Sequence, residues 1–398
     1  MVRTAVLYSA VLFGPLSGSA VITLLQTFSV TYGVSLSVAS LVIPFYTFPF
    51  AFCQLFSGAI ADAFSKKKAL VWGLGLFGLS CLLIGYSQNI ETVLVARFFM
   101  GVFGSFQIPI VIGIVGEASD ENRGRAFGIL SVFINVGLAM GPFVAGLTDV
   151  LSSWQIFFQV IGFLALVNTV VVYLTLDYPD PDHGTSSKLD RFGLTAQFIV
   201  TALRNRQVWL LAVAGMFAFA GLVSAYIFLP TYLRDLNFTQ DVAGLTVSMA
   251  GLVGMVFGPA SGRAVDKFGR KIPLVVGFGI GIVTAILFGL FLDSSAPVWL
   301  AFVLMGMIGL GNSFSQAANN TISAEVIPEL KATVASISSS FRFIAFAGLS
   351  FLMPFYIAFG FGAIMFLSVC SMALGILLFL PLNTRPGVPR VVSGMEEI

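Results

Sequence analysis

Two arginines lie inside long apolar segments of the sequence. Arg97 belongs to the apolar run 92–116, and Arg342 lies near the middle of the run 333–357, one turn after Ser338. A charged side chain is costly in hydrocarbon, so it normally meets a partner or a wet cavity and marks a functional site. A guanidinium there can hold an anionic ligand by charge-assisted hydrogen bonds. Arg97 lies about five residues from one end of its run, so extension of its side chain to the membrane surface is an alternative.

Further polar side chains within apolar runs are candidates for the same ligand site. They are Gln26, Gln107, Tyr226, Asn312 and Gln316. Asn312, Gln316 and Asn319 fall on one stripe of a helix, and polar groups in lipid need partners, so the stripe should face the interior. Ligand binding and hydrogen bonding between helices are equally open for this stripe.

The composition shows what surrounds these side chains. Lys and Arg total 20 and Asp and Glu total 18, so charged residues make up 10% of the 398, against about 25% in soluble domains. Hydrophobic residues make up 58%. A soluble globular protein is therefore excluded, because it needs a charged surface. A net charge of +2 also excludes a nucleic-acid binder.

Long apolar runs predict an all-α membrane protein with twelve transmembrane helices. A span needs about 20 apolar residues. The predicted helices are 4–28, 38–60, 69–88, 92–116, 126–148, 154–176, 207–233, 241–262, 272–292, 297–320, 333–357 and 360–382. Residues 177–206 form the one long polar stretch, and we interpret them as a cytoplasmic linker between two six-helix bundles, 1–176 and 207–382. Residues 383–398 are predicted to be a cytoplasmic tail.

The basic residues predict the orientation. With the N-terminus in the cytoplasm, the inside loops hold Lys66, Lys67, Lys68, Arg123, Arg125, Arg263, Lys267, Arg270, Lys271 and Lys331. The opposite loops hold one basic residue, Arg234. Because basic loops stay inside, both termini are predicted to be cytoplasmic, in a multi-pass protein of the cell (plasma or inner) membrane.

The two halves repeat each other at the ends of corresponding helices. The segment from Gly262 through Asp266 to Arg270 matches the pattern Gly-x-x-x-Asp-(Arg/Lys)-x-Gly-Arg-(Arg/Lys), and a less complete copy surrounds Asp62. Acid and base are also spaced by six residues twice, in Glu117 with Arg123 and in Glu325 with Lys331. Duplicated six-helix halves with a site between them are a transporter design.

On these motifs the chain resembles the major facilitator superfamily over essentially its whole length. The resemblance implies two pseudo-symmetric six-helix bundles that expose a central site to each side in turn. It also implies that Asp62 and Asp266 contact the starts of helices eleven and five and latch the cytoplasmic side. Arg270, Glu117 and Arg123 are the neighbouring candidates for this gating.

The fifth predicted helix carries a series of small residues. Gly128, Gly137, Gly141-Pro142 and Ala145-Gly146 are similar to a signature of antiporters in this superfamily, the drug:proton antiporter group. Gly137, Gly141 and Ala145 share one face, and Gly254, Gly258 and Gly262 offer a matching strip on helix eight. We therefore expect a contact between helices five and eight that opens and closes, with static packing of small residues as the alternative.

These observations predict a secondary transporter that exports amphipathic compounds, coupled to protons. No carboxylate lies in mid-span, so Asp149, or the group of Asp62 and Glu117, would have to titrate. An organic-anion carrier that uses the intramembrane arginines is the alternative. We expect no enzyme activity, no cofactor and no metal site, a small-molecule substrate, the lipid bilayer as the surrounding partner, and a monomer.

Overall fold

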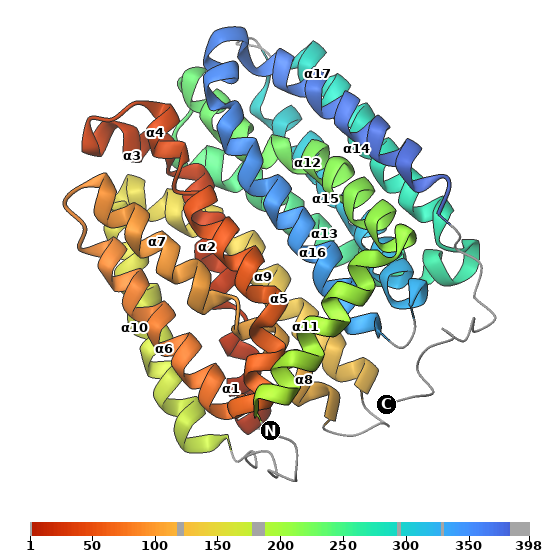
Figure 1. The fold of residues 1–398 in the computed structure, drawn as a ribbon. Coiled ribbons are helices and arrows are strands. Elements are labelled where there is room, and N and C mark those ends of the chain that lie inside the picture. Colours follow the sequence, from red (N-terminus) through yellow and green to blue (C-terminus); the bar gives the residue numbers. More distant parts are fainter. Residues whose placement is uncertain (1, 118–122, 177–187, 293–295, 328–329, 383–398) are drawn as a thin grey trace.

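The computed structural model describes the whole chain except residues 1, 118–122, 177–187, 293–295, 328–329 and 383–398. Side chains in further stretches, among them 58–64, 115–129 and 188–192, are not described either. Every regular element in the described part is a helix (Figure 1). For description, the helices before residue 177 are called the first half, and those from Arg206 onward the second half.

The described part of the first half contains ten helices, several of them short. In chain order they are α1 (Val2–Ala10), α2 (Phe13–Thr23), α3 (Leu25–Tyr32), α4 (Leu36–Ser40), α5 (Pro44–Phe64), α6 (Lys66–Gly85), α7 (Ile90–Gly104), α8 (Gln107–Glu117), α9 (Arg123–Leu151) and α10 (Trp154–Thr175). The second half contains α12 (Arg206–Asp235), α13 (Gln240–Phe268), α14 (Lys271–Phe291), α15 (Val298–Val326), α16 (Lys331–Leu349), the 3₁₀ turn η3 (Ser350–Leu352) and α17 (Met353–Phe379).

Eleven stretches of the described chain are long and apolar enough to cross a membrane. The last of them, Thr333–Phe379, has 47 residues, or about 70 Å of helix, which is more than twice the thickness of a bilayer core. Its chain breaks at Gly360, whose φ of 80° and ψ of 179° are not helical. This stretch therefore makes two crossings, which agrees with the twelve predicted spans.

Prolines explain why four of the predicted spans are broken. A proline ring clashes with the carbonyl of the residue four positions earlier and provides no N–H for it. Pro15, Pro44, Pro109 and Pro354 lie four residues after Val11, Ser40, Ser105 and Ser350. These four residues mark the ends of α1, α4 and α7 and the start of η3. The sequence analysis predicted these spans as continuous helices, and in the structure they are interrupted.

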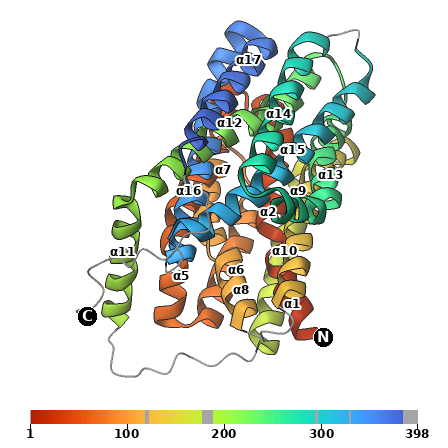
Figure 2. The same cartoon turned by 90° about the vertical axis from the view of Figure 1, so that its right-hand side faces the viewer.

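The polar linker contains a helix that the sequence analysis did not predict. This helix, α11 (Lys188–Arg204), contacts α5 of the first half and both α12 and α16 of the second half. It leads into the start of α12 and lies along one side of the molecule next to α5 and α16 (Figure 2). The linker thus packs against both halves.

Helices pair in the same way within each half. In the first half α6 packs on α10 and α7, α5 on α7, and α2 on α9. In the second half α14 packs on α17 and α15, α13 on α15, and α12 on α16. These pairs occupy corresponding positions in the order of the twelve crossings. The packing therefore repeats the duplication that the loop motifs indicate.

Between the halves, the main contacts join α9 to α13 and α5 to α16 (Figure 2). We call the end where α5 meets α6 and α13 meets α14 the basic end, after residues such as Lys66 and Lys271. The other is the opposite end. At the opposite end, the Ser40 hydroxyl of the first half donates to the Ser350 carbonyl of the second at 3.3 Å. That carbonyl also accepts from the Met353 N–H within η3, so the Ser40 hydroxyl adds a second bond to it across the halves.

Candidate functional site

Arg342 lies among three helices of the second half. Its guanidinium, on α16, donates to the side-chain oxygen of Gln316 on α15. Its Cζ lies 5.9 Å from the centre of the Phe219 ring on α12. Among the described side chains it has no carboxylate partner, and five N–H donors cannot all be satisfied by one amide oxygen. Arg342 can therefore hold an anionic or polar group of a ligand beside an aromatic ring.

The amide stripe of α15 continues this polar surface. Asn319 donates to the Ser338 hydroxyl of α16 at 3.3 Å, while its side-chain oxygen has no protein partner. The side-chain oxygen of Asn312 is likewise buried without a protein partner. Gly215 of α12 leaves room on the other side, since a Cβ there would lie 3.6 Å from the Asn319 oxygen. Two acceptors thus remain available next to Arg342 and Gln316.

Arg97 has a different environment. Its side chain is 1% exposed, so it does not extend to the membrane surface as the sequence alternative held. Its Nε donates to the Val42 carbonyl at 3.0 Å, and its Cζ lies 4.3 Å from the centre of the Tyr46 ring. A cation over an aromatic face is stabilised by the ring quadrupole. Arg97 is therefore enclosed inside the first half, with its partners on the neighbouring chain segment.

The break between α4 and α5 explains the bond from Arg97. Within this break the Tyr46 N–H donates to the Ile43 carbonyl at 3.1 Å rather than to Val42. The Val42 carbonyl therefore needs another donor, because a buried unpaired carbonyl is costly. Arg97 supplies that donor across the helix pair α5 and α7. The substrate-binding role predicted for Arg97 has no support in this geometry.

Two other predicted ligand residues remain inside the protein without a defined partner. Gln107, at the start of α8, is 1% exposed, and neither its side-chain nitrogen nor its oxygen has a protein partner. It lies against α2, where a Cβ on Gly14 would be 3.1 Å from its oxygen. Tyr226 of α12 is partly buried and packs against the hydrophobic core. Gln107 therefore packs within the first half, whereas Arg342 lies in the second.

Gln26 and Asp149 lie at the opposite end. Gln26 of α3 donates to a carboxylate oxygen of Asp235 on α12 at 2.7 Å. Asp149 of α9 accepts from the Thr27 hydroxyl at 2.8 Å. Gln26 therefore joins the two halves, and its predicted role in ligand binding stays a prediction. Asp235 was missed because it lies at the end of an apolar run, where a charge needs no special explanation.

The predicted contact between helices five and eight exists, but with other residues. A Cβ on Gly137 would lie 2.7 Å from the Leu12 carbonyl, and one on Gly141 would overlap the Leu16 carbonyl, so both glycines face the first crossing. Nothing lies within 4 Å of such a Cβ at Gly258 or Gly262. The expected pairing of these two strips is therefore wrong.

Neighbouring positions make the contact between α9 and α13. A Cβ on Gly146 would lie 2.6 Å from the Gln240 carbonyl, one on Gly244 would overlap the Pro142 carbonyl, and one on Gly251 would lie 2.7 Å from the Ala139 Cα. The helices are thus closest along the half of α13 nearer the opposite end.

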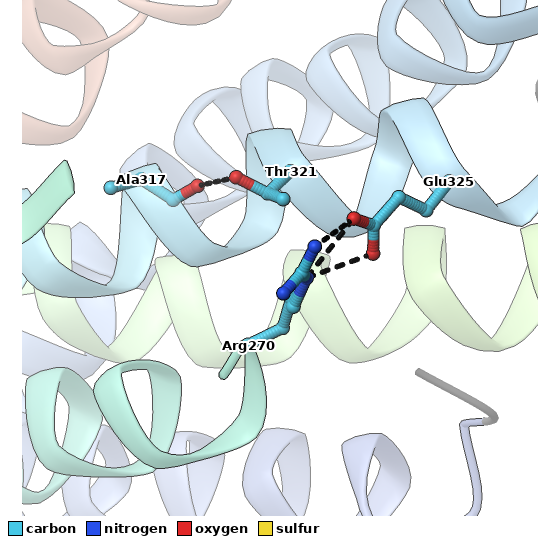
Figure 3. A network of polar contacts seen from close by, with 4 residues as sticks. All are labelled: Arg270, Ala317, Thr321 and Glu325. Atoms are coloured by element: carbon cyan, nitrogen blue, oxygen red, sulfur yellow. Dashed lines mark hydrogen bonds and ion pairs between the residues drawn. The ribbon is translucent and has the colours of Figure 1, made fainter. Parts of the chain in front are cut away.

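At the basic end, an ion pair links the loop after α13 to α15. Arg270 donates through Nε to Glu325 at 3.0 and 3.1 Å and through a second nitrogen at 2.5 Å (Figure 3). This two-pronged bond raises the pKa of the Arg270 guanidinium above its usual value, and the charge of Asp266 adds to the effect. Thr321, one turn before Glu325, donates instead to the Ala317 carbonyl at 3.0 Å. The motif thus fastens two helices of the same half.

The remaining gating candidates fall partly outside the described part of the chain. The side chains of Asp62, Glu117 and Arg123 are not described. Asp266 is exposed, and the start of α9, which the resemblance gives as its partner, lies outside the described side chains. The predicted contacts of Asp62 and Asp266 with helices eleven and five therefore stay predictions.

Comparison with known proteins identifies the family. The family model for the Major Facilitator Superfamily matches residues 7–348. The chain is 24% identical to a riboflavin transporter of Clostridioides difficile, over 87% of this chain and 86% of that protein. It is 26% identical to a 4-hydroxybenzoate transporter of Pseudomonas aeruginosa, over 70% and 68% of the two chains. A crystal structure of a D-xylose-proton symporter has the same fold, with a TM-score of 0.77, 15% identity, and coverage of 96% and 97%. The chain therefore belongs to the Major Facilitator Superfamily, and it is a membrane protein that moves small molecules by secondary transport, not an enzyme.

Proposed function

We propose that this transporter exports amphipathic small molecules in exchange for protons. The observation that carries the proposal is the environment of Arg342. Its guanidinium has N–H donors without a protein partner and lies beside the Phe219 ring, and Asn319, one turn after Gln316 on α15, has a buried amide oxygen without a protein partner. Pockets that bind small molecules combine mostly apolar walls with a few fixed polar groups. A ligand with a polar head and an aromatic or aliphatic body suits this combination.

The export direction and the exchange with protons are supported by the sequence of α9. Its glycines and Pro142 are similar to the signature of antiporters in the superfamily. Asp149 is the described acid best placed to connect proton binding with movement. It is partly buried, it accepts from Thr27 of the first half, and it lies within electrostatic reach of Arg234 in the second half.

Transport by purified protein in liposomes tests this proposal. We expect an imposed pH gradient to drive accumulation of amphipathic aromatic compounds, and Asp149→Asn to uncouple that accumulation from the gradient. Glu91→Gln is a matched control, because Glu91 is an exposed acid at the same end. Accumulation that is equal with and without the gradient would contradict proton coupling, and failure to move any amphipathic compound would contradict the substrate class.

A second candidate is an organic-anion carrier. It is favoured because Arg342 has a neutral amide, rather than a carboxylate, as its protein partner. An anionic ligand would neutralise the guanidinium and add charge-assisted bonds. Arg342→Gln should then abolish transport of aromatic carboxylates while sparing neutral analogues of the same size. Equal loss for both classes would instead indicate a general requirement for Arg342.

A further inference from the structure

Residues of α3 and α9 in the first half meet two adjacent residues of α12 at the opposite end of the molecule. Gln26 and Thr27 belong to the first half, and Arg234 and Asp235 to the second. Gln26 binds Asp235 directly. Thr27 binds Asp149 of α9, whose carboxylate is attracted by Arg234. We call this set of five residues the clasp.

Asp235 uses both of its carboxylate oxygens in the clasp. One of its carboxylate oxygens accepts from the Gln26 side chain at 2.7 Å, across the two halves. The other accepts from the Tyr356 hydroxyl of α17, within the second half. The Gln26 amide also donates to the Thr231 carbonyl at 3.2 Å, one turn before Asp235 on α12. A single carboxylate therefore ties α3 to both α12 and α17.

The bond between Gln26 and Asp235 lies where the two halves would separate if this end of the molecule opened. The close approach of α9 to α13 and the Ser40 bond to Ser350 also lie toward this end. Those contacts are backbone packing or a neutral hydrogen bond. The bond between Gln26 and Asp235 has a charged acceptor, which strengthens it relative to a neutral bond, but Asp235 is exposed, so water reduces that gain. This bond must break if the halves are to separate at this end.

We infer that Asp235 is a gating residue that holds the opposite end closed through Gln26. Tyr356 acts as its positioning residue, because it fixes the second carboxylate oxygen and so directs the first toward α3. This inference rests on the proposed movement of the two halves, and it assigns that movement a specific closing contact. Asp235 touches no ligand in this assignment, so its removal should change the distribution of states before it changes ligand selectivity.

Distance measurements between spin labels test the inference. One label at Val30→Cys, an 83% exposed residue of α3, and one at Thr239→Cys, an exposed residue before α13, report the opposite end. Labels at Leu174→Cys and Phe268→Cys, both exposed, report the basic end. The background lacks the native cysteines Cys53, Cys81 and Cys370.

Asp235→Ala should increase the population with a long distance at the opposite end about threefold, the effect of losing one solvent-exposed charge-assisted bond. Asp235→Asn, which keeps an acceptor, should produce a smaller increase. Gln26→Ala should increase it at least as much as Asp235→Ala, because it also removes the bond to the Thr231 carbonyl, and the double variant should add nothing to Gln26→Ala. Tyr356→Phe should produce an intermediate increase.

Glu91→Gln is the control and should leave the distances unchanged. Unchanged distances in Asp235→Ala, with a monodisperse and folded variant, would overturn the inference, as would additive effects of Gln26→Ala and Asp235→Ala. Transport in liposomes separates the two claims. If amphipathic compounds are carried but Asp235→Ala does not shift the distances, the gating role of Asp235 is refuted and the proposed substrate class is not. If the distances shift but no such compound is carried, the proposed substrate class fails and the gate stands.

Discussion

Arg97 and Arg342 are both arginines inside apolar helices, but the protein provides partners for their guanidinium groups to different extents. Arg97 is 1% exposed, donates to a carbonyl that a helix break has freed, and lies against the Tyr46 ring. Arg342 is partly exposed, bonds one neutral amide, and lies farther from the Phe219 ring. The first guanidinium completes the structure of its own half. The second retains hydrogen-bonding capacity for something that the protein does not supply.

The comparison shows that a charge within a span is not by itself a ligand site. Its cost in hydrocarbon must be offset, and either the fold or a ligand can do this. The four predictions below test the distinction, from the largest expected effect to the smallest.

Arg97→Ala should lower the free energy of unfolding by about 3 kcal/mol, because it leaves a cavity and an unpaired carbonyl. Chemical unfolding in detergent measures this change. Arg342→Ala serves as the matched variant and should cost about 1 kcal/mol or less, since its partly exposed site can be filled by water. Equal losses for the two variants would remove the distinction between the arginines.

Arg342→Gln should weaken binding of an aromatic carboxylate by a free energy of about 2 kcal/mol, which is the value of a hydrogen bond to a charged group. Equilibrium binding to the folded protein measures this change. Arg97→Gln should leave the affinity of the folded fraction unchanged. A comparable loss of affinity in Arg97→Gln would mean that Arg97 also reaches the ligand.

The losses of unfolding free energy caused by Tyr46→Leu and by Arg97→Ala should deviate from additivity by about 1–2 kcal/mol. This is the value expected for a desolvated cation over an aromatic ring. A double-mutant cycle on the two positions isolates this term. Tyr46→Leu combined with Arg342→Ala is the control pair and should be additive. Absence of coupling in the first pair would show that the ring contributes packing alone.

Phe219→Leu should weaken binding of an aromatic anion by about 0.5 kcal/mol, the smallest of these effects, because the ring lies at the limit of cation–π range from Arg342. The same variant should not alter binding of a non-aromatic carboxylate. If both ligands lose affinity equally, Phe219 supports the position of Arg342 instead of contacting the ligand.

Much of the fold could be predicted from the sequence. The twelve crossings agree with the structure once the break at Gly360 divides the last long stretch. The helix breaks before Pro15, Pro44, Pro109 and Pro354 were missed, although each lies four residues before its proline and follows from backbone chemistry. The helix α11 was missed because its polar surroundings lower the mean hydropathy, while its apolar face packs against α5 and α16.

The candidate site was harder to predict. Arg342 and Gln316 were predicted and are in contact, because both lie on interior faces of adjacent helices. Gln26 was also predicted as a ligand residue, and in the structure it lies at the opposite end, bound to Asp235. A polar residue in an apolar run needs a partner, but the run does not say which helix provides it. Phe219 and Asp235 gave no signal of their own, since each acquires its role from a neighbour distant in sequence.

The sequence alone determined the solvent of this protein, the number of its crossings and its duplicated plan, since these depend on local sums of apolar and charged side chains and on repeated motifs. The tertiary structure decided which neighbour each face meets. Gly137 and Gly141 share a helix face in any α-helix, but the packing of α9 turned that face toward α2 and left Gly146 for α13. In the same way, only the arrangement of helices buried Arg97 against its protein partners and left Arg342 with unsatisfied donors. Helix periodicity fixes which residues share a face, whereas the rotation and contacts of the helix depend on long-range packing.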